Sequence, residues 1–162
     1  MIRYCPHCWA ENAYEADACA TCGASLDERG KEFVDMLIDA VGHPEPTRAV
    51  IAIEILGRHL CEARAVAALL TRLARNPDSM DVTTAAAEAL GLIGEPRAVP
   101  ALAALLLDAG RPLTARLAAA EALAALGGPA AWQALAATAA LPQLPRLLRR
   151  VIESASRREG EK

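Results

Sequence analysis

Four of the five cysteines in this 162-residue chain form two Cys-x-x-Cys pairs close to its start. The pairs are Cys5 with Cys8 and Cys19 with Cys22, and ten residues separate them. Zinc is bound tetrahedrally by thiolates, and two short turns of this kind supply two thiolates each. The spacing therefore predicts one structural Zn²⁺ held by all four cysteines, which leaves no open coordination position for catalysis.

Other uses of these reactive residues are weaker hypotheses. A redox Cys-x-x-Cys pair is expected in a thioredoxin-like βαβ context, which this sequence lacks. His7 is an alternative metal ligand, but four well-spaced thiols already supply a full set of ligands, so we expect His7 to be a surface residue. The fifth cysteine, Cys61, shares a turn with His59, and a catalytic Cys–His pair would also need a third, orienting group. We therefore predict no catalytic residue in this chain.

A unit of nearly constant length repeats through the rest of the chain. Glu54-Ile-Leu, Glu88-Ala-Leu and Glu121-Ala-Leu mark the same position in three successive units, and the first interval is one residue longer than the second. The pattern within each unit predicts two helices joined by a turn, because apolar residues recur at helical spacing and Gly or Pro interrupts them. The one extra residue falls in the turn over 57–63. Such units bury their apolar faces only by stacking on their own copies.

These signals predict four segments: a zinc ribbon over 1–26, a connector with a packing helix over 27–45, a helical solenoid over 46–158 and a disordered tail over 159–162. The first helix of each repeat, the A helix, is expected over 46–59, 80–92 and 113–126. The second, the B helix, is expected over 64–75, 96–108 and 129–140. Residues 145–158 are expected to form a last A helix, and its charged outer face would end the stack. His43, in the turn before the first repeat, is given no role.

Two stretches resemble known families. The segment from Ala89 to Leu102, Ala-Leu-Gly-Leu-Ile-Gly-Glu-Pro-Arg-Ala-Val-Pro-Ala-Leu, resembles HEAT repeats of the short type found in phycobilin lyases. This resemblance implies an all-α fold, a right-handed α-α superhelix of about three and a half repeats. Residues 4–26 resemble the short zinc ribbons at the N-termini of many bacterial proteins. In HEAT stacks the B helices usually line the concave face, so the resemblance implies a concave surface for a protein partner.

The B-helix positions left over from packing predict where that partner binds. They form a shallow, alanine-rich groove with arginines at one edge, which suits an apolar helix or peptide. The predicted contact residues are Arg64, Ala68, Thr71, Arg97, Ala101, Ala104, Ala134 and Ala137. A solvated face made of good helix formers explains the same alanines, and that alternative stays open.

We expect a non-enzymatic interaction module. Deoxyhypusine hydroxylases are built from similar repeats and bind iron through His-Glu pairs, but this sequence contains no such pair, so that activity is not carried over. The resemblance to phycobilin lyases concerns the scaffold, and a lyase-type enzyme accessory is the second alternative function. Glu54, Glu88 and Glu121 recur at one helix position about 10 Å apart, which predicts a solvated ladder of carboxylates.

The charge of the chain argues against nucleic acid as the main partner. The formal net charge is −3, whereas nucleic-acid binders usually carry a strong basic patch. The first alternative function is nevertheless a nucleic-acid-associated protein that uses the ribbon with Arg146, Arg149 and Arg150. No apolar run approaches the roughly 20 residues of a membrane span, and the start lacks a secretory signal. Paired cysteines that bind metal imply a reducing compartment, so we expect a cytoplasmic protein.

Overall fold

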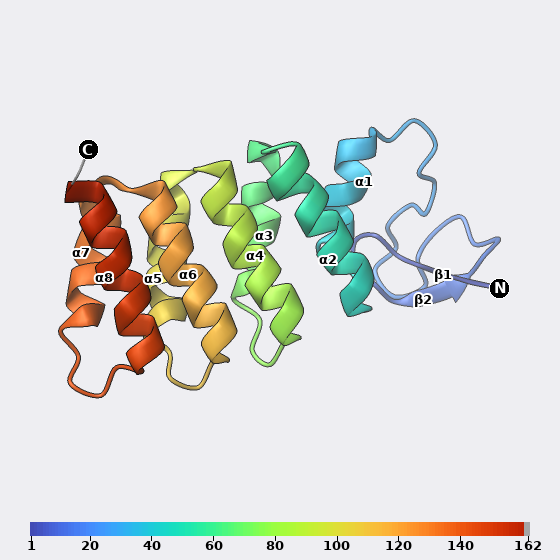
Figure 1. Cartoon of the computed structure of the whole chain (residues 1–162). Helices are drawn as coiled ribbons and strands as arrows, with labels where there is room; N and C mark the ends of the chain where they lie inside the picture. Colours follow the sequence, from blue (N-terminus) through green and yellow to red (C-terminus); the bar gives the residue numbers. More distant parts are fainter. Residues whose placement is uncertain (161–162) are drawn as a thin grey trace.

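The computed structural model describes residues 1–160 as a stack of helix pairs preceded by a small β-ribbon (Figure 1). The ribbon pairs β1 (Ile2–Tyr4) with β2 (Glu11–Ala13) in antiparallel register. One row of the stack holds the A helices α2 (Pro46–Glu54), α4 (Met80–Ile93), α6 (Leu113–Leu126) and α8 (Arg146–Gly160). The second row holds the B helices α3 (Val66–Leu73), α5 (Val99–Leu107) and α7 (Gly128–Ala139). The predicted all-α solenoid with a cysteine-bearing head is confirmed.

The last helix is longer than predicted. The α8 helix runs to Gly160, whereas the sequence suggested a disordered tail from Glu159. Arginine and glutamate are good helix formers, and no helix-breaking residue precedes Gly160 in this helix. Residues 161 and 162 of the predicted tail lie outside the described part of the chain. Within that part, no helix is both long and apolar enough to cross a membrane.

The Gly-Glu-Pro turn between α4 and α5 has a clear steric origin. Gly94 ends α4 in the left-handed region at φ 78°, which glycine adopts without cost. Glu95 follows in an extended conformation, and Pro96 begins a short 3-10 turn, η3 (Pro96–Ala98). Proline fits there because the first turn of a helix has no partner for its backbone N–H.

The extra residue of the first repeat is absorbed inside a helix. After α2, the chain forms a π-helical turn, η1 (Ile55–His59), in which the N–H of Leu60 donates to the carbonyl of Ile55 at 3.0 Å. A π-turn holds one more residue than an α-turn, so the insertion does not shift the helix register. The chain then passes through the 3-10 turn η2 (Ala63–Ala65) into α3.

Glycine allows the first A helices to approach closely. Gly57 lies against Ala89, and Gly91 lies against Ala122. A Cβ atom on either glycine would come within 2.7 Å of the alanine Cα, so the two backbones are nearly in contact. These A helices are therefore packed through small residues rather than through large side chains.

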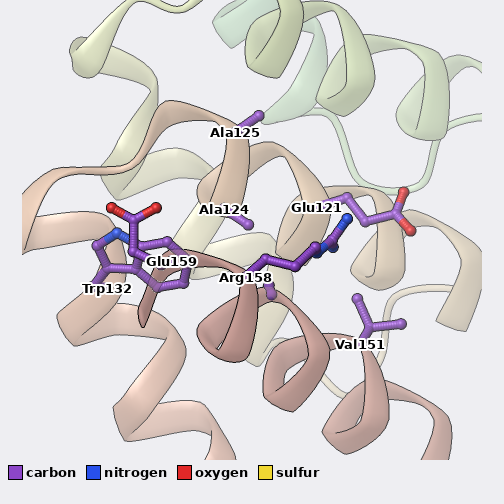
Figure 2. A pocket seen from close by; sticks show the side chains of 8 residues that line it. Glu121, Ala124, Ala125, Trp132, Val151, Arg158 and Glu159 are labelled. Atoms are coloured by element: carbon purple, nitrogen blue, oxygen red, sulfur yellow. The ribbon is translucent and has the colours of Figure 1, made fainter. Parts of the chain in front are cut away.

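The third A–A interface lacks this glycine, and a hollow opens there. Ala124 occupies in α6 the repeat position that Gly91 occupies in α4, and Ala155 of α8 likewise corresponds to Ala122. Both alanines line a hollow of about 390 Å³ bordered by α6, α7 and α8. Figure 2 shows this hollow with Trp132 at one side and Glu121 at the other. The indole Nε1 of Trp132 is buried with no hydrogen-bond partner among the described residues.

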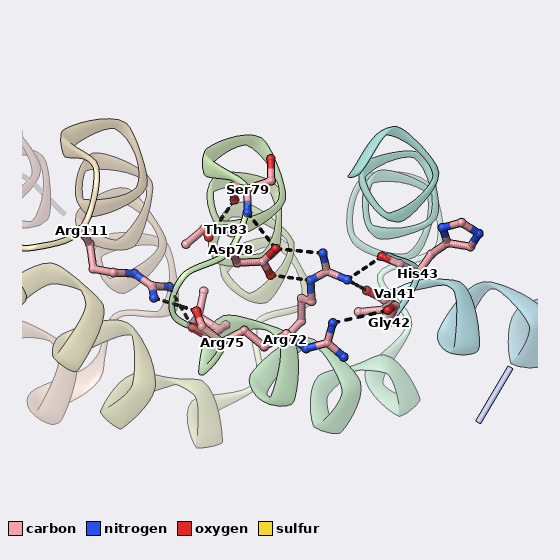
Figure 3. A network of polar contacts seen from close by, with 10 residues as sticks. Val41, Gly42, His43, Arg72, Arg75, Asp78, Ser79, Thr83 and Arg111 are labelled. Atoms are coloured by element: carbon pink, nitrogen blue, oxygen red, sulfur yellow. Dashed lines mark hydrogen bonds and ion pairs between the residues drawn. The ribbon is translucent and has the colours of Figure 1, made fainter. Parts of the chain in front are cut away.

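An arginine caps the C-terminal end of each B helix. In each case the guanidinium donates to a backbone carbonyl, with nitrogen–oxygen distances between 2.6 and 3.0 Å. The four accepting residues are spaced almost equally along the chain. The donor–acceptor pairs are Arg72 with Val41, Arg111 with Leu73, Arg116 with Leu106, and Arg149 with Ala139. The helix α1 (Phe33–Ala40) receives the first of these caps (Figure 3). It therefore stacks as the B helix of a leading half repeat.

The two ends of the stack differ. On α8, the side chains of Arg150, Glu153 and Arg157 are exposed. Their repeat equivalents on α6 are Leu117, Ala120 and Ala124, which pack in the core of the stack. The predicted charged outer face of the last helix is thus present.

Candidate metal centre and helical faces

The two Cys-x-x-Cys turns have the same backbone hydrogen bonds. The N–H of Cys5 donates to the carbonyl of Ala10 at 3.0 Å, and the N–H of Cys19 donates to that of Ala24 at 2.8 Å. Cys5 and Cys19 are buried, whereas Cys8 and Cys22 are exposed. Each turn therefore places one thiol inside the ribbon and one at its surface.

Each turn also contains one residue in the left-handed region. In the second turn this residue is Gly23 at φ 72°, and in the first it is Trp9 at φ 60°. A non-glycine residue in such a region costs roughly 1–3 kcal/mol and persists only where its surroundings hold it. The tryptophan is therefore kept in a conformation that a glycine would adopt more easily.

The four sulfur atoms lie at the distances expected around one metal ion. All four Sγ atoms lie within 4.8 Å of one another, and Cys5 is 3.7 Å from Cys22. Cys8 is 3.6 Å from Cys19. A tetrahedron with metal–sulfur bonds of about 2.3 Å has sulfur–sulfur edges of about 3.8 Å. The cluster can hold a metal ion, as the cysteine spacing predicted.

Electrostatics also favour a bound cation. The backbone N–H of Cys22, followed by that of Thr21, hydrogen-bonds the Cys19 sulfur and lowers the pKa of Cys19 to about 6, although burial opposes the shift. The N–H of Ala10 lowers the pKa of Cys8, but partial desolvation by the ribbon and the neighbouring sulfurs outweigh it and raise that pKa to about 12. Four thiolates this close therefore repel one another, and a dication would relieve that repulsion.

The ribbon is docked on the first turn of the stack through His43, for which the sequence suggested no role. The rings of Trp9 and Tyr4 lie 4.8 and 5.3 Å from the His43 imidazole, measured between centroids. His43 is buried, and its Nδ1 accepts a hydrogen bond from the N–H of Glu45 at 2.9 Å. Burial lowers the pKa of His43 below its ordinary value, so the ring is neutral near pH 7.

The predicted partner-binding alanines of α5 line a second hollow. Ala101 and Ala104 border a space of about 300 Å³ between α3 and α5, with Leu70, Leu73 and Leu105 as its apolar walls. Of the other predicted residues, Ala68 and Thr71 lie on α3, while Ala134 and Ala137 lie on α7. The structure therefore brings two of the eight predicted residues to this hollow.

The two predicted edge arginines have different surroundings. Arg64 lies between 3.2 and 3.6 Å from carboxylates of Glu62, Glu32 and Asp35, so it links α1 to the turn before α3. Arg97 is exposed and pairs with Glu95 at 3.3 Å. Arg97 is thus the more accessible of the two for a partner.

The two rows of helices pack differently. The A helices approach one another through Gly57 and Gly91, whereas α3 and α5 leave a hollow between them. The concave position of the B helices stays a prediction. The predicted surface is therefore called the B-helix face.

The repeated glutamates form a solvated ladder, as predicted. Glu54 and Glu121 are exposed, and Glu88 pairs with Arg58 at 3.3 Å. The thiol of Cys61 donates to the carbonyl of Gly57, which gives this thiol a structural contact.

Of the three arginines predicted for nucleic acid, one is already engaged. Arg149 donates to the carbonyls of Ala139 and Leu141 at 2.6 and 2.8 Å as the cap of α7. Arg146 and Arg150 are exposed on the first turns of α8.

Comparison with known proteins agrees with the repeat architecture. The HEAT-repeat family matches residues 34–115, about half of the chain, and this range begins within α1. No curated protein shows significant similarity to the chain. The solved structure of human deoxyhypusine hydroxylase in complex with glycerol is similar, with 27% sequence identity and a TM-score of 0.65. The similarity covers 85% of this chain and 48% of the human protein, so the chain spans about half the length of that enzyme.

This comparison overturns one prediction. We expected a non-enzymatic protein because the sequence has no His-Glu pair, but the similar structure is that of an enzyme. The exclusion of enzymatic activity is therefore wrong. The repeated helix pairs, the Gly-Glu-Pro turn and the match over half its length show that the chain belongs to the HEAT-repeat family.

Proposed function

We propose that the chain is a zinc-stabilised HEAT scaffold whose B-helix face binds a segment of a partner protein. The observation that carries this proposal is the hollow between α3 and α5, where Ala101 and Ala104 leave room between leucine walls. Small residues beside buried leucines allow an apolar side chain of a partner to enter, as in helix-in-groove recognition. The rim includes the exposed Asp108, whose carboxylate would orient the bound segment.

The proposed metal is Zn²⁺, because four thiolates in a tetrahedron are its usual structural site. The four thiols must stay reduced to bind it, which fits the cytoplasm. We expect one Zn²⁺ per chain in freshly purified reduced protein, measured by elemental analysis. Cys8→Ser should lose the metal, whereas Cys61→Ser, outside the cluster, should keep it. A native protein with intact thiols and no bound metal would contradict the zinc proposal.

Partner binding is tested with matched surface substitutions on the two faces. Ala104 on α5 and Ala125 on α6 are both exposed helical alanines that line hollows, one on each row. We expect Ala104→Arg to abolish capture of a partner found by crosslinking in native cells, because the arginine fills the hollow between α3 and α5. Ala125→Arg should leave capture unchanged. The reverse result would place the partner on the A row and refute the proposed face.

A further inference from the structure

We infer that metal binding by the four cysteines controls the order of the α3–α5 hollow, through Trp9. This inference rests on the proposed metal site and on the hollow as the proposed binding site. A continuous set of packed and hydrogen-bonded residues joins the two, beginning at the first cysteine turn and ending at the loop before α4. The ribbon is thus a regulatory element for the B-helix face.

The first step is the conformation of Trp9. The N–H of Trp9 donates to the carbonyl of Cys5 at 2.8 Å and closes the first cysteine turn. In the second turn the equivalent donor is Gly23, which bonds Cys19 at 2.9 Å. Because a left-handed tryptophan is strained, the turn stays closed only while the cysteines are held together. Released cysteines would let Trp9 return to an ordinary conformation, and its side chain would then point elsewhere.

The second step is the contact between Trp9 and the turn after α1. A Cβ atom added to Gly42 would collide with the indole ring of Trp9, so the ring lies directly on the glycine backbone. The His43 ring packs on Trp9 from the next position and also meets Tyr4. The position of this turn therefore depends on where the Trp9 ring lies.

The third step connects this turn to α3. Arg72 donates to the carbonyls of Val41 and His43 at 3.0 and 2.8 Å, and its side chain is buried. Arg75 lies beside it and donates to the carbonyl of Gly42 at 3.4 Å. Figure 3 shows the two guanidinium groups directed at the same turn. A displaced turn would leave both arginines without these acceptors.

The last step reaches the rim of the hollow. Arg72 pairs with Asp78 through contacts of 2.6 and 3.0 Å, and Asp78 also accepts the N–H of Ser79 at 2.7 Å, just before α4. The loop between these residues contains Asn76, which lines the hollow. Arg111, also at the rim, donates to the carbonyl of Arg75 at 2.7 Å. Loss of the Arg72 contacts would therefore loosen one wall of the hollow.

The test follows both ends of this connection in the full-length chain. The chain has two tryptophans, so Trp132→Phe leaves Trp9 as the one fluorescent indole. The metal is removed with EDTA and restored with Zn²⁺, and amide hydrogen exchange is measured in parallel. We expect removal to shift Trp9 emission to longer wavelength and to speed exchange over 33–43 and 72–79 about tenfold. Exchange over 113–126, in α6, should not change.

A matched variant separates the contact from the metal site. Trp9→Gly supplies the residue type that the second turn already has, so we expect it to keep the metal. It should nevertheless show fast exchange over 72–79 whether or not metal is bound. If Trp9→Gly keeps slow exchange there, or if metal removal shifts Trp9 emission without altering exchange over 72–79, the inference is overturned. Absence of metal from the purified native protein would instead refute the zinc proposal, while Trp9→Gly would still decide the role of the contact.

Discussion

The arginine caps give the sharpest test of how this stack is held together. Arg111, just before α6, reaches back to α3, where its two terminal nitrogens donate to the carbonyls of Arg75 and Leu73 at 2.7 and 3.0 Å. Its side chain is buried. Replacing it with methionine keeps most of the aliphatic volume but removes both donors. The two carbonyls at the end of α3 would then lack partners in a site that water reaches poorly.

The size of the effect follows from the two lost hydrogen bonds. A hydrogen bond from a charged donor contributes about 1.5–3 kcal/mol, and a buried carbonyl left without a partner is costly. We therefore expect Arg111→Met to lower the free energy of unfolding by about 3–5 kcal/mol. For a chain of this length, that corresponds to a fall in melting temperature of roughly 10 °C. The stability of Arg111→Lys should lie between those of the native chain and Arg111→Met, because one ammonium group cannot donate to both carbonyls as the planar guanidinium does.

The measurement is urea unfolding followed by circular dichroism of the helices, with Arg97→Met as the matched control. Arg97 is also an arginine on a B-helix turn, but its side chain is 68% exposed and pairs with the carboxylate of Glu95 at 3.3 Å. Its loss should cost less than about 1 kcal/mol. If Arg111→Met costs no more than this control, the caps do not stabilise the stack and the reasoning fails.

Three further changes have defined outcomes. Gly91→Ala should destabilise the chain by about 1–3 kcal/mol by forcing α4 and α6 apart, while Gly160→Ala, with open space around it, should be neutral in the same unfolding assay. Burial lowers the pKa of His43 in the folded chain, so as the pH falls the unfolded chain protonates this ring before the folded chain does. The free energy of unfolding should therefore fall as the pH drops below about 6.5. This loss of stability should be smaller in His43→Gln. If the free energy of unfolding falls equally steeply with pH in the native chain and the variant, His43 is not its cause. Trp132→Phe removes a buried N–H that has no hydrogen-bond partner within residues 1–160, and it should change the free energy of unfolding by less than about 1 kcal/mol.

The repeat period was sufficient to predict most of the helices. The expected A helices over 80–92 and 113–126 agree with α4 and α6 within one residue, because small apolar residues and Gly/Pro turns mark both ends. The cysteine spacing likewise predicted the cluster. These features are local, so a single sequence carries them.

Features that depend on distant contacts were not predictable. The capping arginines reach the same carbonyl position from different sites. Arg116 and Arg149 share one repeat position, but Arg72 and Arg111 lie elsewhere, so alignment of the repeats does not reveal the whole set. The contact between Trp9 and His43 joins two segments with no shared pattern. The π-turn at 55–59 was missed because an insertion in a turn and one in a helix give the same spacing.

The charged outer surface of α8 has a consequence for the association of folded chains. An alanine-rich face such as that of α6 accepts another helix pair without any specific recognition, so a stack that ended there would polymerise end to end. On α8 the charged side chains of Arg150, Glu153 and Arg157 prevent such association because they would have to lose their hydration. The opposite end of the stack is covered by the ribbon, which depends on its four cysteines. The two ends lose their protection under different conditions, because removing the metal with a chelator would open the ribbon and leave the charged helix α8 intact. The two ends of the described stack are therefore protected from end-to-end association in different ways.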